Sequence, residues 1–139
     1  MGAPPPVEPL RGVRVLVVDD DPVVAQLLSA LLLGAGAEVR SATSGQEALA
    51  AIDADPPDVL VSDLYMPGLD GFALVRAIRE RPPEEGGRLP AVAVTAHMSF
   101  ETRRDAVRAG YQDVLPKPFG SEHLIRIVLA LAAGPEPPA

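Results

Sequence analysis

The 139-residue sequence contains no cysteine, which excludes disulfide frameworks, thiolate metal sites and cysteine nucleophiles. It also lacks an excess of positive charge, because it has 12 Lys and Arg against 19 Asp and Glu, for a net charge of −7. This balance argues against binding to nucleic acid, which requires a basic face. No apolar run reaches the about 18 residues of a membrane span. The start, Met1 to Pro6, has neither the basic nor the apolar region of a secretory signal. We therefore expect an acidic, soluble, cytoplasmic protein that binds neither nucleic acid nor membrane.

The length is that of one domain, and a hydrophobic content of 47% is enough for a core of its own. Seven of the 16 prolines lie near the two ends of the chain, where no apolar periodicity is visible. We therefore predict one domain over residues 12–133. Proline-rich tails, extended or disordered, are expected at residues 1–11 and 134–139.

Short apolar runs alternate with helical patterns along the predicted domain. Strands are expected at 14–18, 38–41, 58–62, 91–94 and 112–115, and helices at 22–33, 44–53, 71–80, 99–110 and 121–133. Asp21, Ser44 and Ser99 are residues that cap helices. Strands that alternate with helices form parallel sheets through right-handed crossovers. The pattern predicts a doubly wound, flavodoxin-like α/β fold with strand order 2-1-3-4-5 and five flanking helices.

Acidic side chains stand at the ends of two strands that this order makes neighbours. Asp19 and Asp20 follow the first strand, and Asp63 follows the third. Because ligands of such sheets bind outside the carboxyl ends of the strands, we expect these carboxylates to meet in one crevice. Carboxylates crowded together repel one another unless a cation lies among them. An open site with few oxygen ligands suits Mg²⁺ (or Mn²⁺) better than Ca²⁺ or Zn²⁺.

Two further polar residues stand at the ends of the remaining strands. Thr95 ends the fourth strand and Lys117 follows the fifth. A hydroxyl, an ammonium group and a bound metal can together hold the oxygens of a phosphoryl group in transfer. Asp63 lies centrally among them and suits the role of a carboxylate nucleophile. Asp21 is better explained as a helix cap than as a metal ligand.

The motifs at these strand ends resemble those of the receiver domain of bacterial two-component response regulators. The resemblance extends over residues 13–133 and is carried by the segments 17–22 (VVDDDP), 62–71 (SDLYMPGLDG), 94–96 (VTA) and 115–119 (LPKPF). It implies that a histidine kinase or a histidine phosphotransfer protein donates a phosphoryl group to one aspartate with the help of Mg²⁺. The long loop 81–88 and the sequence of residues 110–118 resemble the corresponding segments of receivers attached to hybrid sensor kinases. This weaker resemblance suggests that the domain belongs to a phosphorelay.

The resemblance also implies a role for each of the site residues. Asp63 is the implied phosphoacceptor, and Thr95 and Lys117 the implied ligands of the phosphoryl oxygens. The implied metal ligands are Asp19, Asp20, Asp63 and the backbone carbonyl of Tyr65. A cis peptide bond is implied between Lys117 and Pro118, where the sequence offers an X–Pro bond in a tight loop.

One position departs from the family pattern. Receivers usually carry an aromatic residue three positions before the lysine, where it follows the threonine as a switch, but this chain has Val114. Tyr111 lies three residues earlier and is not assumed to replace it. Tyr65 and His97 occupy positions that the family varies, and they are candidates for tuning the lifetime of the acyl phosphate or are exposed without effect.

Two of the expected helices carry more apolar residues than one buried face needs. The first helix, residues 22–33, is apolar nearly all round, which suggests a docking surface for a kinase or phosphotransfer helix. In the last helix, Ile125, Leu129 and Ala132 form a second apolar strip. We interpret this strip as a homodimer or output-domain contact, or as a face lying beside neighbouring helices.

Two other functions compete with the phosphoacceptor. A receiver-like interaction module that is never phosphorylated is the first, and Val114 is the feature that leaves room for it. A haloacid-dehalogenase-type phosphatase is the second, because residues 19–23 (DDDPV) fit its Asp-x-Asp-x-Val start. Such a phosphatase needs an acidic pair after the lysine, whereas only Glu122 and Glu136 follow Lys117 here.

Overall fold

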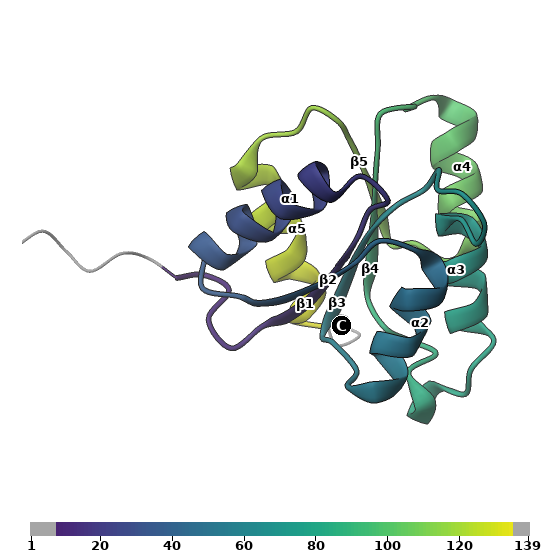
Figure 1. Cartoon of the computed structure of the whole chain (residues 1–139), viewed down its shortest axis with the longest axis horizontal. Coiled ribbons are helices and arrows are strands. Elements are labelled where there is room, and N and C mark those ends of the chain that lie inside the picture. The colour runs from purple at the N-terminus through teal and green to yellow at the C-terminus, as the bar shows by residue number, and fades with distance from the viewer. Residues whose placement is uncertain (1–7, 135–139) are drawn as a thin grey trace, which may run out of the picture.

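A computed structural model describes residues 8–134 as a three-layer α/β structure, with a central sheet between two layers of helices (Figure 1). The strands are β1 (Arg14–Val18), β2 (Glu38–Ala42), β3 (Val59–Asp63), β4 (Ala91–Thr95) and β5 (Asp113–Pro116). The helices are α1 (Pro22–Gly34), α2 (Gly45–Ala54), α3 (Gly71–Arg79), α4 (Phe100–Ala109) and α5 (Ser121–Ala132). These elements agree with the predicted ones to within two residues at their ends.

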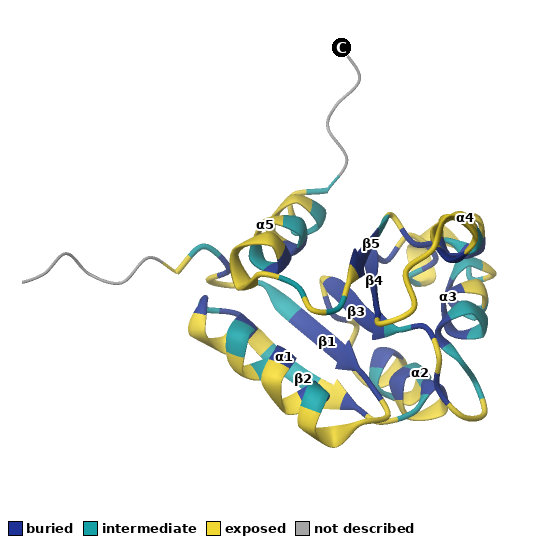
Figure 2. Ribbon diagram, turned by 90° about the horizontal axis from the view of Figure 1, so that it is seen from above, coloured by how far each residue is buried: buried dark blue, intermediate teal, exposed yellow. Residues whose placement is uncertain are grey.

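The five strands form one parallel sheet in the order β2-β1-β3-β4-β5, as predicted. Helices cover both of its faces: α1 and α5 lie on one side, and α2, α3 and α4 on the other (Figure 2). Successive side chains of a strand point to opposite faces of the sheet. Val15 and Val17 therefore pack in a first core against α1 and α5, and Leu16 and Val18 pack in a second core against α2, α3 and α4. This double burial explains why the strands are nearly uniformly apolar.

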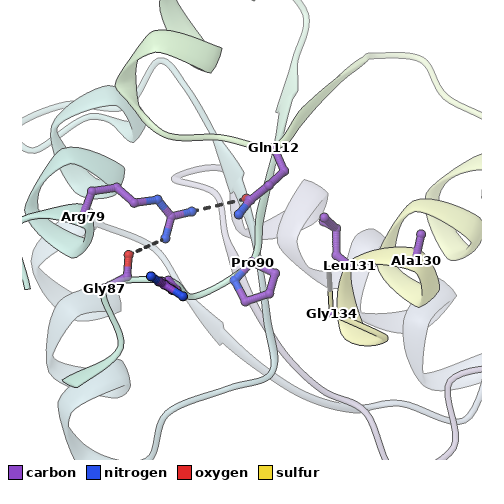
Figure 3. Close-up of a pocket in the computed structure, with 8 residues that line it drawn as sticks. Arg79, Gly87, Pro90, Gln112, Ala130, Leu131 and Gly134 are labelled. Atoms are coloured by element: carbon purple, nitrogen blue, oxygen red, sulfur yellow. Dashed lines mark hydrogen bonds between the residues drawn. The ribbon is translucent and has the colours of Figure 1, made fainter. Parts of the chain in front are cut away.

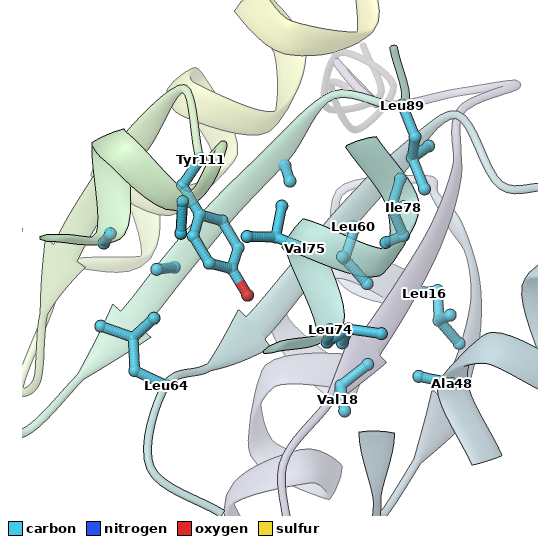
Figure 4. Packing of buried hydrophobic residues seen from close by; sticks show 14 of the residues in the cluster. Leu16, Val18, Ala48, Leu60, Leu64, Leu74, Val75, Ile78, Leu89 and Tyr111 are labelled. Atoms are coloured by element: carbon cyan, nitrogen blue, oxygen red, sulfur yellow. The ribbon is translucent and has the colours of Figure 1, made fainter. Parts of the chain in front are cut away.

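The second core contains a tyrosine that lies against the start of α3 (Figure 4). Tyr111 is 2% exposed, and its hydroxyl donates a hydrogen bond of 2.7 Å to the carbonyl oxygen of Gly71. Burial raises the pKa of this phenol above its usual range, so it stays protonated and acts as a donor. Tyr111 therefore anchors the segment that follows β3 from the inside of the protein.

The predicted helix caps are confirmed by their hydrogen bonds. Asp21 accepts from the amide of Val23, Ser44 from Glu47, and Ser99 from Thr102. The sequence analysis missed a fourth cap, Asp70, whose side chain accepts from Ala73 at the start of α3. Each cap satisfies an amide that has no partner within its helix.

Two segments outside the main helices and strands show details that were not predicted. The segment 81–88, predicted as an irregular surface loop, contains a 3₁₀ turn at Pro83–Glu85, and its Gly87 is buried. Leu10, predicted to lie in the N-terminal tail, is fully buried, and its amide donates to Ala35. The rest of the predicted tails, residues 1–7 and 135–139, lies outside the described residues. Between residues 8 and 134, every helix is too short or too polar to cross a membrane.

Candidate phosphoryl-transfer site

Strand register brings the acidic residues together at the carboxyl edge of the sheet. Val18 of β1 pairs with Ser62 of β3, so the residues that follow them, Asp19 and Asp63, lie side by side. Strand β4 pairs with β3 on its other side. The point between β1 and β3 is where the strand order reverses, which is the usual ligand-binding position of this architecture.

The three carboxylates form a compact group. Asp19, Asp20 and Asp63 each place one oxygen within 4.8 Å of the others. The three differ in solvent access, because Asp19 is 1% exposed, Asp63 is half-buried and Asp20 is exposed. Asp19 and Asp63 are also held by backbone amides, since they accept hydrogen bonds from Asp21 (2.9 Å) and Leu64 (2.8 Å). The predicted acidic cluster therefore exists, with an inner wall and an open side.

A lysine reaches the same group from β5. The ammonium nitrogen of Lys117 lies 2.9 Å from a carboxylate oxygen of Asp19 and 3.9 Å from one of Asp63. The Lys117–Pro118 peptide bond is cis, as predicted. The backbone of Lys117 donates to the carbonyl of Thr95, and so ties the lysine loop to the end of β4. Lys117 is the cation that faces both acids in the part of the chain that the structure describes.

The charges of the site compete at Asp63. Burial raises the pKa of its carboxyl group above the ordinary value, and the neighbouring Asp19 carboxylate adds to this effect. Lys117 and the backbone amides of Leu64 and Tyr65 act in the opposite direction. Because the raising effects prevail, a further cation beside Asp63 would favour the ionised form, which is the nucleophilic one.

The remaining predicted site residues surround this group. Thr95 is fully buried, and its hydroxyl oxygen accepts a hydrogen bond of 3.0 Å from the amide of His97. Tyr65 is 46% exposed, and its ring packs edge-on against His97 at a centroid distance of 5.3 Å. Val114, by contrast, is buried in the core. Val114 is therefore a packing residue, and the aromatic ring beside the site belongs to Tyr65.

A separate cavity lies at the opposite edge of the sheet (Figure 3). Its volume is about 360 Å³, and it is lined by Arg79, Pro90, Gln112 and Leu131 among others. The Arg79 guanidinium donates to the carbonyls of Gly87 and Gly110 and to the side chain of Gln112. These bonds join the end of α3 to the starts of β4 and β5, so Arg79 has a structural role there.

Comparison with known proteins places the chain among signalling domains. The family model described as the response regulator receiver domain matches residues 15–129. The DNA-binding transcriptional regulator NtrC of Salmonella typhimurium is 41% identical over 118 residues, which is 85% of this chain and 24% of NtrC. The chain thus spans about a quarter of that relative.

Two solved receiver domains are similar over nearly their whole length. The receiver domain of NtrX from Brucella abortus is 33% identical, with a TM-score of 0.79, 87% coverage of this chain and 99% of the other. The receiver domain of the sensor histidine kinase PA1611 from Pseudomonas aeruginosa is 32% identical, with a TM-score of 0.80 and coverages of 88% and 99%. The latter structure has a magnesium ion coordinated in its active site cleft.

Proposed function

The chain belongs to the response regulator receiver domain family, the phosphoacceptor modules of two-component systems, and from this premise we propose that Asp63 is its phosphoacceptor. The observation that carries the proposal is the convergence of Asp19, Asp20, Asp63 and Lys117 at one edge of the sheet. Asp63 is the member of this group that ends the central strand β3, and it faces both an acidic pair and a cation.

The donor set fits a hard divalent cation. Three carboxylate oxygens within 4.8 Å of one another are oxygen ligands only, and the exposed side at Asp20 leaves room for water and phosphate oxygens. We propose that Asp19, Asp20, Asp63 and the backbone carbonyl of Tyr65 hold Mg²⁺, or Mn²⁺ in its place. When bound, the ion supplies positive charge to the phosphoryl oxygens. The magnesium ion in the PA1611 receiver supports this assignment.

Different residues of the site have different roles in phosphoryl transfer. A carboxylate oxygen of Asp63 attacks phosphorus as the bond from phosphorus to the donor's histidine nitrogen breaks, and the freed histidine takes up a proton. Lys117 and the hydroxyl of Thr95 bind phosphoryl oxygens and stabilise their charge. The amide of Leu64 holds Asp63 in position at 2.8 Å. We propose that the protein catalyses only its own phosphorylation and dephosphorylation.

A small phosphodonor tests this function without the kinase. With Mg²⁺ and acetyl phosphate, we expect the intact mass of the protein to increase by one phosphoryl group, and the label to be stable in acid and lost in base. Labelling should require Mg²⁺ or Mn²⁺, and Ca²⁺ serves as the control ion. Steady turnover of p-nitrophenyl phosphate would instead favour the phosphatase alternative. Failure to label, or to bind beryllofluoride with Mg²⁺, would favour the module that is never phosphorylated.

Receiver domains interact with histidine kinases and output domains, and the outer face of α1 is our proposed kinase surface. Val23, Leu27 and Leu33 are 71%, 57% and 55% exposed, although α1 buries Ala25, Leu28 and Leu32 as its inner face. A groove of about 800 Å³ continues this surface between α1 and α5. Because α1 begins three residues after Asp19, a helix bound along the first turns of α1 would lie next to the phosphoryl-transfer site.

Polar substitutions on this surface should slow phosphoryl transfer from a protein donor but not from acetyl phosphate. We expect Leu27→Gln to reduce the rate of transfer from a kinase or phosphotransfer protein about tenfold, a typical effect of losing one apolar anchor at an interface. Labelling by acetyl phosphate should stay unchanged. The partner is chosen from purified kinases and phosphotransfer proteins of the same genome by transfer to the unmodified protein. Equal transfer rates to Leu27→Gln and to the unmodified protein would contradict the proposal that the outer face of α1 binds the kinase.

The apolar strip predicted on α5 borders the same groove. Ile125 and Leu129 line it opposite Ala30 and Leu31 of α1, and Leu129 is 41% exposed. We propose that this strip extends the α1 docking surface. A homodimer or an output-domain contact through α5 is the other interpretation. Sedimentation over a range of concentrations tests the homodimer, since it alone of these interpretations predicts a mass that rises with protein concentration.

A further inference from the structure

Val114 leaves this receiver without an aromatic side chain at the usual switch position. It is 3% exposed and packs in the core, and a valine has no ring that could move between two positions. Tyr111, an aromatic residue buried in the same core, is fixed by its hydrogen bond to Gly71. A change at the phosphoryl-transfer site must therefore reach the surface through other residues.

Tyr65 links the acceptor loop to the start of α4. Its hydroxyl lies 3.2 Å from the side-chain oxygen of Thr102, which is 8% exposed in the first turn of α4. Thr102 in turn accepts a hydrogen bond of 3.0 Å from the hydroxyl of Ser99, the residue that caps α4. One continuous chain of hydroxyl groups thus joins the residue two positions after Asp63 to the cap of a helix.

The same tyrosine is held from two other sides. Its ring packs edge-on against Phe72 of α3 at 5.7 Å and against His97 at 5.3 Å, and the amide of His97 is bonded to Thr95. The amide of Leu64, the residue before Tyr65, also donates a hydrogen bond of 2.8 Å to the Asp63 carboxylate. Asp63 and Thr95, which are proposed to accept and to bind the phosphoryl group, are therefore both connected to Tyr65.

We propose that Tyr65 is the positioning residue that couples phosphorylation of Asp63 to α4, in place of the missing aromatic residue at Val114. This inference rests on the proposed function of Asp63. A phosphoryl group on Asp63 attracts the Thr95 hydroxyl, and a rotation of Thr95 toward it weakens its bond to the amide of His97. The His97 loop then shifts against the Tyr65 ring, and the Tyr65–Thr102 bond transmits the shift to the first turn of α4.

Amide hydrogen exchange of residues 99–104, followed by mass spectrometry, measures the coupling directly. In the unmodified protein, Mg²⁺ with beryllofluoride should change the exchange of this segment and leave that of α2 unchanged. Tyr65→Phe keeps the ring contacts and removes only the hydroxyl. We expect it to reduce the induced change by about threefold or more, the scale of one lost hydrogen bond. Thr102→Val removes the same bond from the other side and should have the same effect, and the double variant should add nothing further.

Ser99→Ala is the matched control, because it removes the α4 cap and the last hydroxyl of the chain but keeps the Tyr65–Thr102 bond that is proposed to transmit the shift. It should speed exchange in both states and preserve the difference between them. A full beryllofluoride response in Tyr65→Phe, or no response of α4 in the unmodified protein, would overturn the inference. Labelling by acetyl phosphate is measured on the same proteins. Absence of labelling in all of them contradicts the proposed function itself, whereas normal labelling with an undiminished α4 response contradicts only the role of Tyr65.

Discussion

Asp63→Asn is expected to abolish phosphorylation by acetyl phosphate and by any kinase. An amide oxygen is a far weaker nucleophile than a carboxylate, and no other acid of the described site ends the central strand as Asp63 does. The measurement is the intact mass after incubation with Mg²⁺ and acetyl phosphate. Asp20→Asn is the control, because it removes a carboxylate at the exposed edge of the same cluster and leaves the acceptor. Asp20→Asn should still be labelled when the Mg²⁺ concentration is raised to compensate for the weakened metal site. A persistent label in Asp63→Asn at a second site would contradict the assignment.

The same substitution should stabilise the protein in the absence of metal. The pKa of Asp63 is raised in the folded protein, mainly by burial, so the folded state binds this proton more tightly than the unfolded chain. Ionised Asp63 therefore lowers the free energy of unfolding above the folded pKa. This penalty decreases as the pH falls below the folded pKa and is lost below the pKa of the unfolded chain. Denaturant unfolding with a metal chelator should show Asp63→Asn more stable at pH 7, with the difference shrinking toward pH 4. An unchanged or lower stability at pH 7 would show that attraction to Lys117 outweighs burial.

The position of the site follows from the sequence because parallel strands impose it. Once strands end before Asp19 and at Asp63, and the order makes them neighbours, their carboxylates share one edge whatever the details of packing. The place of Lys117 beside the acids was likewise predicted from its position after the fifth strand, whereas the cis bond before Pro118 was implied only by the family resemblance. The structure contains both the cis bond and a 2.9 Å contact from Lys117 to Asp19. Backbone topology alone thus explains most of what could be predicted.

Contacts between side chains of different elements could not be predicted in this way. The bond from Tyr65 to Thr102 joins residues 37 positions apart, and that from Tyr111 to Gly71 joins residues 40 positions apart. Each depends on how α3 and α4 pack, to within a fraction of an ångström, and no sequence periodicity encodes this. The apolar excess of α1 was visible in the sequence, but which of its residues remain exposed was set by the packing of α1 on the sheet.

A methyl group at Gly71 should displace the acceptor loop. The β-carbon of an alanine there would lie 2.2 Å from the carbonyl oxygen of Asp63 and 2.7 Å from the α-carbon of Leu64. Both are backbone atoms, so no side chain can turn aside to make room. Gly71 also donates its amide to Leu64 and accepts the Tyr111 hydroxyl, which ties it in place. We expect Gly71→Ala to lower the free energy of unfolding by about 3 kcal/mol, the upper range for overpacking.

The backbone that must move carries both Asp63 and Tyr65, so Gly71→Ala should also slow labelling by acetyl phosphate at temperatures where the variant is still folded. Gly34→Ala is the matched control, because the added methyl group meets no atom within 4 Å at the end of α1. Alanine favours helix over glycine by about 1 kcal/mol, so this variant should be as stable as the original protein or more so. Denaturant unfolding and labelling rates of the two variants, compared side by side, check the prediction. Equal stability of Gly71→Ala and Gly34→Ala would mean that the acceptor loop yields easily, and that Gly71 does not hold Asp63 in place.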